Sequence, residues 1–289
     1  MFNGFTSATI EADSVSINLK HGGDGPPVLL LHGYPQTHVM WHRIAPMMAG
    51  DYTLVAPDLR GYGDTSKPPT DADHAPYSKR AMAADMVAVM AQLGFDEFHV
   101  VGHDRGGRVG HRLAADHPDK VKKLAVLDIA PTHHMYAETD KEFATGYYHW
   151  FFLIQPADLP ERLIGADPEY FLRKKMGHWS ADGAVFDPAA MAEYIRCFSN
   201  PATIHATCED YRAAASIDLG HDEADMGVKL TCPVLALWGA RGLVARRFDV
   251  LSAWRERAEN VSGGTVDCGH FLAEEAPEAT YAALRDFLQ

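Results

Sequence analysis

The chain has 289 residues, of which 47% are hydrophobic and 22% are charged, a balance that fits a globular protein with a large core. Its formal net charge of -13 comes from 39 acidic and 26 basic residues, and the sequence has no basic stripe or polybasic arm. These features exclude nucleic acid and anionic membrane surfaces as expected partners.

The sequence carries no pattern for export or membrane insertion. Residues 1–4 lack a basic stretch that leads into an apolar segment, and no apolar run approaches the length of a membrane span. The cysteines show no C-x-x-C spacing, which favours unpaired thiols in a reducing compartment: Cys197, Cys208, Cys232 and Cys268. We therefore expect a cytoplasmic protein.

The order of the predicted elements indicates an α/β fold. The alternating run 14–19 predicts a strand at an antiparallel edge. Continuous apolar runs, typical of strands buried on both faces, follow at 27–31, 52–56, 98–101, 124–127 and 234–237. Helix-period segments lie between them, at 78–93 and 108–117. Strands alternating with helices predict a mostly parallel sheet with helices on both faces.

The alternation stops in the middle of the chain. Between 131 and 227 the sequence has no clear strand pattern, is dense in aromatic residues, and has helical segments at 167–177 and 188–198. We therefore predict a helical cap, or lid, domain over 131–227, inserted into a core domain made of 1–130 and 228–289.

A short turn carries the first candidate catalytic residue. The segment Gly102-His103-Asp104-Arg105-Gly106-Gly107 joins the strand 98–101 to a helix. A residue held between small neighbours on a strand–turn–helix is the usual place for a hydrolase nucleophile, and here that residue is Asp104. Taken alone, the aspartate is explained equally well as a helix N-cap.

Two further motifs favour the catalytic interpretation. His32-Gly33-Tyr34-Pro35 follows the first long buried strand, where a loop can supply a backbone N–H to an oxyanion hole. We expect the N–H groups of Tyr34 and Arg105 to form that hole. Cys268-Gly269-His270 lies near the C-terminus, as a catalytic base would if the order is nucleophile, acid, base. Each motif alone also has an ordinary structural explanation.

In this order the three motifs resemble the α/β-hydrolase family, and the segment 58–63 adds its D-x-R-G-x-G pattern. Many members place the triad acid in G-x-x-D, but this sequence has Gly239-Ala240-Arg241-Gly242 there. The family's alternative position follows the strand 124–127, where Asp128 stands. Asp128 is therefore the predicted partner of His270, whereas Asp249, the nearest acid downstream, is expected within a helix.

A carboxylate nucleophile predicts a specific chemistry. Aspartate has an ordinary pKa of about 4 and is ionised at neutral pH without help from a base. Asp104 can displace a leaving group from saturated carbon to form an ester, which His270 would then hydrolyse by activating water. Carbon–halogen compounds and epoxides are the substrates suited to this reaction.

The residue after the nucleophile narrows the substrate class. Haloalkane dehalogenases usually have tryptophan there, whereas this sequence has Arg105, with Arg108 three residues later. Two guanidinium groups suit the capture of a small carboxylate, although surface arginines on a helix would give the same pattern.

Further segments resemble the haloacetate (fluoroacetate) dehalogenases: 102–108, His149-Trp150, and 208–214. The resemblance implies that Arg105 and Arg108 hold the substrate carboxylate. It also implies that His149, Trp150 and Tyr211 donate hydrogen bonds to the leaving halide. Any one of these three aromatic residues, taken alone, would be read as packing of the lid.

Other chemistries lack support in the sequence. There is no H-E-x-x-H, no C-x-x-C, no P-loop and no G-x-G-x-x-G, so no metal and no cofactor is expected. The predicted reaction converts a short 2-haloacid, fluoroacetate first of all, to glycolate plus halide. The alternatives are an epoxide hydrolase with the same nucleophile and a non-catalytic ligand receptor on the same fold. The family resemblance suggests a homodimer, with a small haloacid as the other partner.

Overall fold

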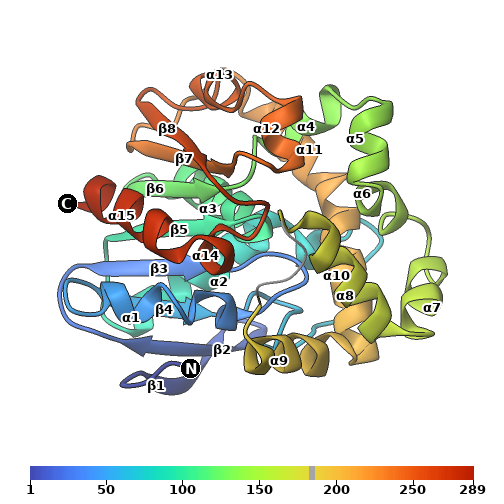
Figure 1. The fold of residues 1–289 in the computed structure, drawn as a ribbon, viewed down its shortest axis with the longest axis horizontal. Helices are drawn as coiled ribbons and strands as arrows, with labels where there is room; N and C mark the ends of the chain where they lie inside the picture. The colour runs from blue at the N-terminus through green and yellow to red at the C-terminus, as the bar shows by residue number, and fades with distance from the viewer. Residues whose placement is uncertain (182–185) are drawn as a thin grey trace.

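The computed structural model describes residues 1–181 and 186–289. Its centre is an eight-stranded sheet in the order β1-β2-β4-β3-β5-β6-β7-β8 (Figure 1). The strands are β1 (Thr6–Ala12), β2 (Val15–Gly22), β3 (Pro27–Leu31), β4 (Thr53–Pro57), β5 (Phe98–His103), β6 (Val121–Leu127), β7 (Val234–Gly239) and β8 (Val261–Val266).

The sheet is mostly parallel, as predicted. β1 and β2 form an antiparallel hairpin, and β2 also pairs antiparallel with β4, whereas β3 to β8 pair parallel. All six residues of β5 are buried, as expected of a central strand covered on both faces. The sequence analysis missed β1, a largely exposed edge strand.

Helices cover both faces of the sheet (Figure 1). α2 and α3 pack against each other on one face, and α1 contacts α15 on the other. The helices outside the β6–β7 connection are α1 (Ala45–Met48), α2 (Lys79–Gln92), α3 (Arg105–Asp116), α12 (Leu243–Arg247), α13 (Val250–Arg255), α14 (Leu272–Glu275) and α15 (Pro277–Leu288), with short 3₁₀ helices at His38–Trp41 and Ala75–Tyr77. The helix predicted at 108–117 begins three residues earlier, directly after the nucleophile turn.

The connection from β6 to β7 is helical, and its helices gather at one end of the sheet (Figure 1). They are α4 (Thr132–Ala137), α5 (Lys141–Gly146), α6 (His149–Phe152), α7 (Leu159–Gly165), α8 (Pro168–Trp179), α9 (Pro188–Phe198), α10 (Pro201–Ala214) and α11 (Ile217–Ala224). The division into a core of 1–130 and 228–289 and a cap of 131–227 stays a prediction.

The carboxyl ends of β3, β5 and β6 lead into the loops that carry the predicted site residues. In open α/β sheets ligands bind at this edge of the sheet. Within the described residues, no helix is long and apolar enough to cross a membrane.

Candidate active site

The nucleophile turn is built by close backbone contacts. A Cβ on Gly102 would lie 2.4 Å from the carbonyl oxygen of Gly106, and a Cβ on Gly106 would lie 2.4 Å from that of His32. Glycine is therefore required at both positions. Asp104 between them has φ 47° and ψ -113°, a strained conformation of the kind found at catalytic turns.

The side chain of Asp104 does not cap α3, although the residue occupies the N-cap position. Instead its Oδ1 accepts a hydrogen bond of 2.9 Å from the backbone N–H of Tyr34. The loop approaches so closely that a Cβ on Gly33 would lie 2.5 Å from the Cβ of Asp104. The capping explanation of Asp104 is therefore wrong, and one predicted oxyanion donor already points at this carboxylate.

His270 and Asp128 meet beside this turn. The Nδ1 of His270 lies 2.6 Å from Oδ2 of Asp128, and the other oxygen of Asp128 accepts from the N–H of Gly239 at 2.9 Å. The Nε2 of His270 is buried without a hydrogen-bond partner among the described residues. Asp249 lies elsewhere, where it caps α13 through the N–H of Ser252. The geometry therefore suits Asp128 as the acid that orients His270.

The charges around Asp104 favour its ionised form. Burial alone would raise the pKa of this carboxyl, but His270, Arg108 and other nearby cationic groups hold it below its ordinary value. Burial would lower the pKa of His270, but the hydrogen bond and charge of Asp128 raise it above the ordinary value. A buried nucleophile that is ionised, beside a histidine readily protonated, suits a two-step displacement and hydrolysis.

Arg105 and Arg108 are both buried, but their guanidinium groups have different partners: an ion pair for Arg105, and uncharged groups for Arg108. Asp210 forms a two-point ion pair with Arg105, from Nε at 2.9 Å and from Nη2 at 2.7 Å. Arg108 donates through Nη1 to the Thr132 hydroxyl at 2.9 Å and to the Ala130 carbonyl at 3.2 Å. The Nη1 of Arg105 and the Nε of Arg108 have no partner among the described residues. Each guanidinium therefore keeps one buried nitrogen with unpaired N–H, Nη1 in Arg105 and Nε in Arg108.

The three residues predicted to hold halide lie around these arginines. The ring of Tyr211 lies 4.1 Å from Cζ of Arg105, and the ring of Trp150 lies 4.7 Å from Cζ of Arg108. The His149 and Tyr211 rings are 5.4 Å apart. The Tyr211 hydroxyl, the Trp150 indole N–H and the His149 Nδ1 are buried without partners in the described part of the chain.

Burial sets the protonation of two of these residues. Burial and the charge of Lys175 lower the pKa of His149, so its imidazole is neutral near pH 7. Burial and the nearby Asp104 raise the pKa of the Tyr211 phenol, so it keeps its proton. Tyr211 therefore remains a hydrogen-bond donor, and neutral His149 still has one N–H to offer.

Comparison with known proteins agrees with this architecture. The family model of the alpha/beta hydrolase fold matches residues 26–277. A fluoroacetate dehalogenase from Burkholderia sp is 48% identical over 100% of this chain and 95% of its own length. The chain belongs to the haloacetate dehalogenase family of α/β hydrolases.

Two further relatives are similar to this chain, one an epoxide hydrolase and one a protein of known structure. A soluble epoxide hydrolase from Corynebacterium sp. (strain C12) is 37% identical over 89% of this chain and 87% of its own. A crystal structure from Nostoc sp PCC 7120, of a protein assigned to the alpha/beta hydrolases, is 63% identical with a TM-score of 0.99. It covers 100% of this chain and 99% of that chain.

The structure of this α/β hydrolase also reveals site residues that the sequence analysis did not identify. Asp210, the partner of Arg105, also binds Lys79 and accepts a 2.6 Å hydrogen bond from the Tyr62 hydroxyl. Tyr147 places its hydroxyl 3.4 Å from Nδ1 of His270. Asp210 lies in the family segment 208–214 and Tyr147 lies two residues before His149, but neither position alone indicates these contacts.

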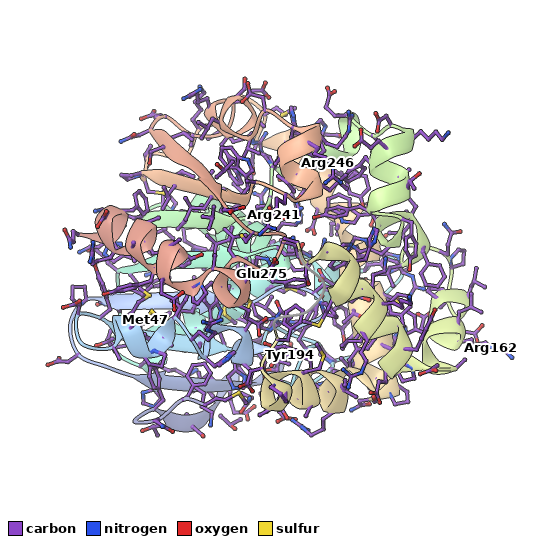
Figure 2. All side chains as sticks on the ribbon, in the orientation of Figure 1. Met47, Arg162, Tyr194, Arg241, Arg246 and Glu275 are labelled. Atoms are coloured by element: carbon purple, nitrogen blue, oxygen red, sulfur yellow. The ribbon has the colours of Figure 1, made fainter. Side chains whose placement is uncertain are left out.

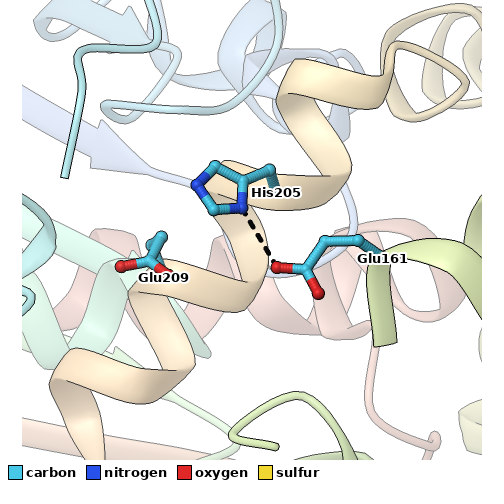
Figure 3. Close-up of side chains that lie close together, drawn as sticks. All are labelled: Glu161, His205 and Glu209. Carbon is cyan, nitrogen blue, oxygen red and sulfur yellow. Dashed lines mark hydrogen bonds and ion pairs between the residues drawn. The ribbon is translucent and has the colours of Figure 1, made fainter. Parts of the chain in front are cut away.

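One group of side chains in the described part of the hydrolase has the spacing of a metal site: Glu161, His205 and Glu209 (Figure 3). His205 Nδ1 lies 3.0 Å from Glu161. Arg212 already donates to both glutamates, at 2.7 Å and 2.6 Å, and Glu209 also accepts from Thr70 at 2.5 Å. The carboxylates are therefore neutralised by a guanidinium, which a metal ion would have to displace.

Proposed function

We propose that this α/β hydrolase removes the halogen from a short 2-haloacid, with fluoroacetate converted to glycolate and fluoride. The observation that carries the proposal is the buried pair Arg105 and Arg108 beside Asp104, each with an unpaired N–H. A buried anionic nucleophile repels an anionic substrate unless cations neutralise the site, and a guanidinium pair matches a carboxylate in shape. The 48% identical fluoroacetate dehalogenase supports this substrate class.

The first step is displacement at saturated carbon. A carboxylate oxygen of Asp104 attacks the carbon that bears the halogen, and the carbon–halogen bond breaks as its electron pair leaves with the halide. His149, Trp150 and Tyr211 donate hydrogen bonds to the departing halide. The product of this step is an ester between Asp104 and the 2-hydroxyacid fragment.

The second step hydrolyses that ester. His270 takes a proton from water through Nε2, and the hydroxide adds to the ester carbonyl of Asp104. The N–H groups of Tyr34 and Arg105 stabilise the oxyanion, while Asp128 stabilises the imidazolium. The proton then passes from His270 to the leaving alkoxide, which departs as the hydroxyacid and restores the carboxylate.

Fluoride release and isotope incorporation test the proposal together. The wild-type protein should release fluoride from fluoroacetate, and a single turnover in ¹⁸O-water should give glycolate without ¹⁸O, because its new oxygen comes from Asp104. The variant H270N should accumulate the ester, seen as added mass on the peptide that contains Asp104. Solvent oxygen in the first-turnover product would instead establish direct attack by water.

The substrate carboxylate is tested by comparing haloacetate with its amide, which is similar in size but neutral. The proposal predicts poor turnover of the haloacetamide by wild type. It also predicts that R108K loses about tenfold or more on haloacetate, since lysine lacks the planar fork. Equal rates on the acid and the amide would refute the carboxylate clamp.

An epoxide hydrolase is the second candidate. An epoxide oxygen needs a proton donor, and the hydroxyls of Tyr34, Tyr136 and Tyr211 are buried and unpartnered within the described residues. The 37% identical epoxide hydrolase points the same way. Diol formation from styrene oxide, without halide release from haloacetates, would establish this alternative. Tight binding of a small molecule without turnover would instead favour a receptor.

We further propose a cytoplasmic protein that uses no cofactor in either step, and the family resemblance suggests that it is a homodimer acting on a small haloacid. Light scattering coupled to size-exclusion chromatography tests the assembly, because a monomer and a dimer of this 31.8 kDa chain differ twofold in mass.

A further inference from the structure

One lysine of α8 is buried without a polar partner. Lys175 is only 2% exposed, and its Nζ has no hydrogen-bond partner among the described residues. Lysine is almost never fully buried unless it is paired, because taking an ammonium group out of water costs free energy. The proposed haloacid reaction gives this amine no role, so its placement points to another use.

The surroundings of Lys175 are aromatic. Its Nζ lies 3.2 Å from the ring centre of Tyr148, 5.2 Å from that of Trp179 and 5.8 Å from that of Phe171. Burial lowers the pKa of the Lys175 amine to about 7, because the charged form loses its hydration. Near pH 7 about half of the molecules therefore carry a neutral amine here, against fewer than about one in a thousand for an ordinary lysine.

Lys175 lines a cavity of ≈ 400 Å³ among the inserted helices. The same cavity is lined by the rings of Tyr148, Tyr170 and Phe171 and by the imidazole of His178. Tyr148 covers Nζ but is itself 45% exposed, so rotation of its ring opens the amine to the cavity. A neutral amine is therefore placed beside a space that a small molecule can enter.

The cavity lies close to the predicted halide site but is distinct from it. The ring of Trp179 lies 4.5 Å from that of His149 on one side and 5.2 Å from Nζ of Lys175 on another. α8 contacts both α7 and α9 in the group of inserted helices (Figure 1), and Figure 2 labels Arg162 of α7 at the outer end of that group. Lys175 therefore neighbours the active site without belonging to the predicted catalytic residues.

We propose that Lys175 is a nucleophilic amine that binds small aromatic aldehydes covalently, as imines, from the cavity that it lines. The neutral Nζ adds to the aldehyde carbon, the carbonyl π electrons move to the oxygen, and a proton passes from nitrogen to oxygen. The resulting hydroxyl group takes a second proton and leaves as water while the nitrogen lone pair forms the C=N bond. Loss of the remaining N–H proton gives the imine and restores the proton donor.

The lining of the cavity favours this class of ligand. Aromatic rings attract one another beyond the area that they bury, and three aromatic side chains stand around the amine. Loss of water needs a proton donor, and the phenols of Tyr148 and Tyr170 and the imidazole of His178 line the same space. Burial raises the pKa of the Tyr148 phenol, so that this donor keeps its proton near neutral pH.

Reductive trapping tests the proposal on the wild-type protein. Benzaldehyde is the probe, and cyanoborohydride reduces any imine to a stable benzylamine that peptide mapping by mass spectrometry assigns to one lysine. Lys174 is the internal control, because it lines the same cavity but is exposed. At pH 7 the initial rate at Lys175 should exceed that at Lys174 by about tenfold or more, since a far larger fraction of Lys175 is neutral.

The dependence of labelling on pH gives a second criterion. The rate at Lys175 should level off above about pH 7, whereas labelling of exposed lysines should keep rising to pH 9. Equal rates at Lys174 and Lys175, or a rate at Lys175 that rises with pH in the same way as the others, would overturn the proposal.

Two variants establish where the reaction occurs. K175M should abolish the rapid phase of labelling, and rapid labelling that persists in K175M would overturn the assignment. K174R is the matched control, because it alters the neighbouring lysine of the same cavity and keeps the charge. Labelling of Lys175 should be unchanged in K174R.

Stability measurements exclude a lysine that stays protonated through its contact with the rings. If Lys175 is neutral above about pH 7, then between pH 7 and about pH 10 the unfolded chain holds a proton that the folded protein has lost. Wild-type stability should therefore rise with pH relative to K175M. The urea midpoint of K175M should exceed that of wild type at pH 6, with a smaller difference at pH 9. A difference that is the same at both pH values would overturn the neutral amine.

This proposal is independent of the proposed function. A protein that releases no halide from haloacetates but labels rapidly at Lys175 would refute the haloacid reaction and support the aldehyde site. Halide release without preferential labelling of Lys175 would do the reverse.

Discussion

Asp210 holds Arg105 by both oxygens of its carboxylate, from Nε at 2.9 Å and from Nη2 at 2.7 Å, and neither side chain is exposed. Arg105 is the first residue of α3, directly after Asp104, whereas Asp210 lies on α10, far along the chain. An acid on one of the helices between β6 and β7 therefore fixes the orientation of the Arg105 guanidinium, a candidate group for binding the substrate.

The variant D210N should lose stability, because Arg105 and Lys79 would remain buried with one negative charge fewer. We expect a decrease of about 3–5 kcal/mol in the free energy of unfolding, measured by urea titration. D64N is the control, since Asp64 pairs with Arg196 at 2.7 Å where both side chains are more than half exposed, and it should lose at most about 1 kcal/mol.

A double-mutant cycle separates the pair from a general packing defect. The combination R105Q/D210N should be more stable than the sum of the single losses, by on the order of 1 kcal/mol or more. Additive losses would show that Asp210 does not act through Arg105. If D210N folds, its KM for haloacetate should rise, because Asp210 would no longer hold the unpaired Nη1 of Arg105 toward the substrate carboxylate.

The leaving-group prediction concerns Trp150. Fluoride leaves saturated carbon reluctantly, and its concentrated charge depends more on donated hydrogen bonds than that of chloride. W150F should therefore lower turnover of fluoroacetate much more than turnover of chloroacetate, and Y211F should shift the ratio in the same direction. W254F is the control, because the Trp254 indole already donates to the Ile129 carbonyl at 3.0 Å and its removal should leave the ratio unchanged. An unchanged ratio in W150F and Y211F would mean that these residues only shape the cavity.

The sequence predicted those parts of the site that local backbone rules determine. Gly102 and Gly106 must be glycine because a Cβ on either would clash with backbone, so their spacing around Asp104 is visible in the chain. Asp128 and His270 follow parallel strands, and their chain order suits a triad. The fold was predictable for the same reason, since buried parallel strands are continuous apolar runs.

Contacts between distant segments could not be read in this way. Nothing in the spacing of Asp210 and Arg105 indicates that they pair, because that contact depends on how α10 packs over the turn. The same holds for Tyr147 beside His270, and for the exposed strand β1, whose side chains contribute little to the core.

A buried acid on α14 predicts an unusual dependence of stability on pH. Burial raises the pKa of Glu274 to about 8, although Tyr194 donates to it at 3.0 Å and Gln36 also donates to it. Between its ordinary value and pH 8 the folded protein therefore holds a proton that the unfolded chain has lost. Stability contributed by this group is complete at low pH and is lost as the pH rises through that range.

The variant E274Q removes this titration while nearly keeping the shape. It should be more stable than wild type at pH 9, by on the order of 2–4 kcal/mol given about 1.4 kcal/mol per pKa unit, and close to wild type near pH 5. The buried Oε1 of Gln36 has no partner among the described residues and can accept from the new amide after a flip. Urea titrations at the two pH values measure the difference, and a constant difference at both would show that Glu274 does not hold its proton.

The last prediction concerns the two chain positions, 128 and 242, from which an acid could orient His270. A Cβ on Gly242 would lie 3.5 Å from Oδ1 of Asp128, so the usual family position and the position used here converge on the same place. D128N should lower kcat by about 10⁴-fold, the order seen when the acid of a Ser-His-Asp triad is replaced, because Asn disfavours the required tautomer of His270. It should also allow the Asp104 ester to accumulate.

Moving the carboxylate from position 128 to position 242 should restore part of the lost activity. Gly242 has φ -78° and ψ 170°, which any residue adopts, so D128N/G242D should exceed D128N in kcat by about tenfold or more, since an acid again faces Nδ1 of His270. D128N/G242N is the matched control and should stay as slow as D128N, because it adds the same bulk without charge. Equal rates in the two double variants would show that Asp128 contributes through packing or its hydrogen bond to Gly239, and not through its charge on His270.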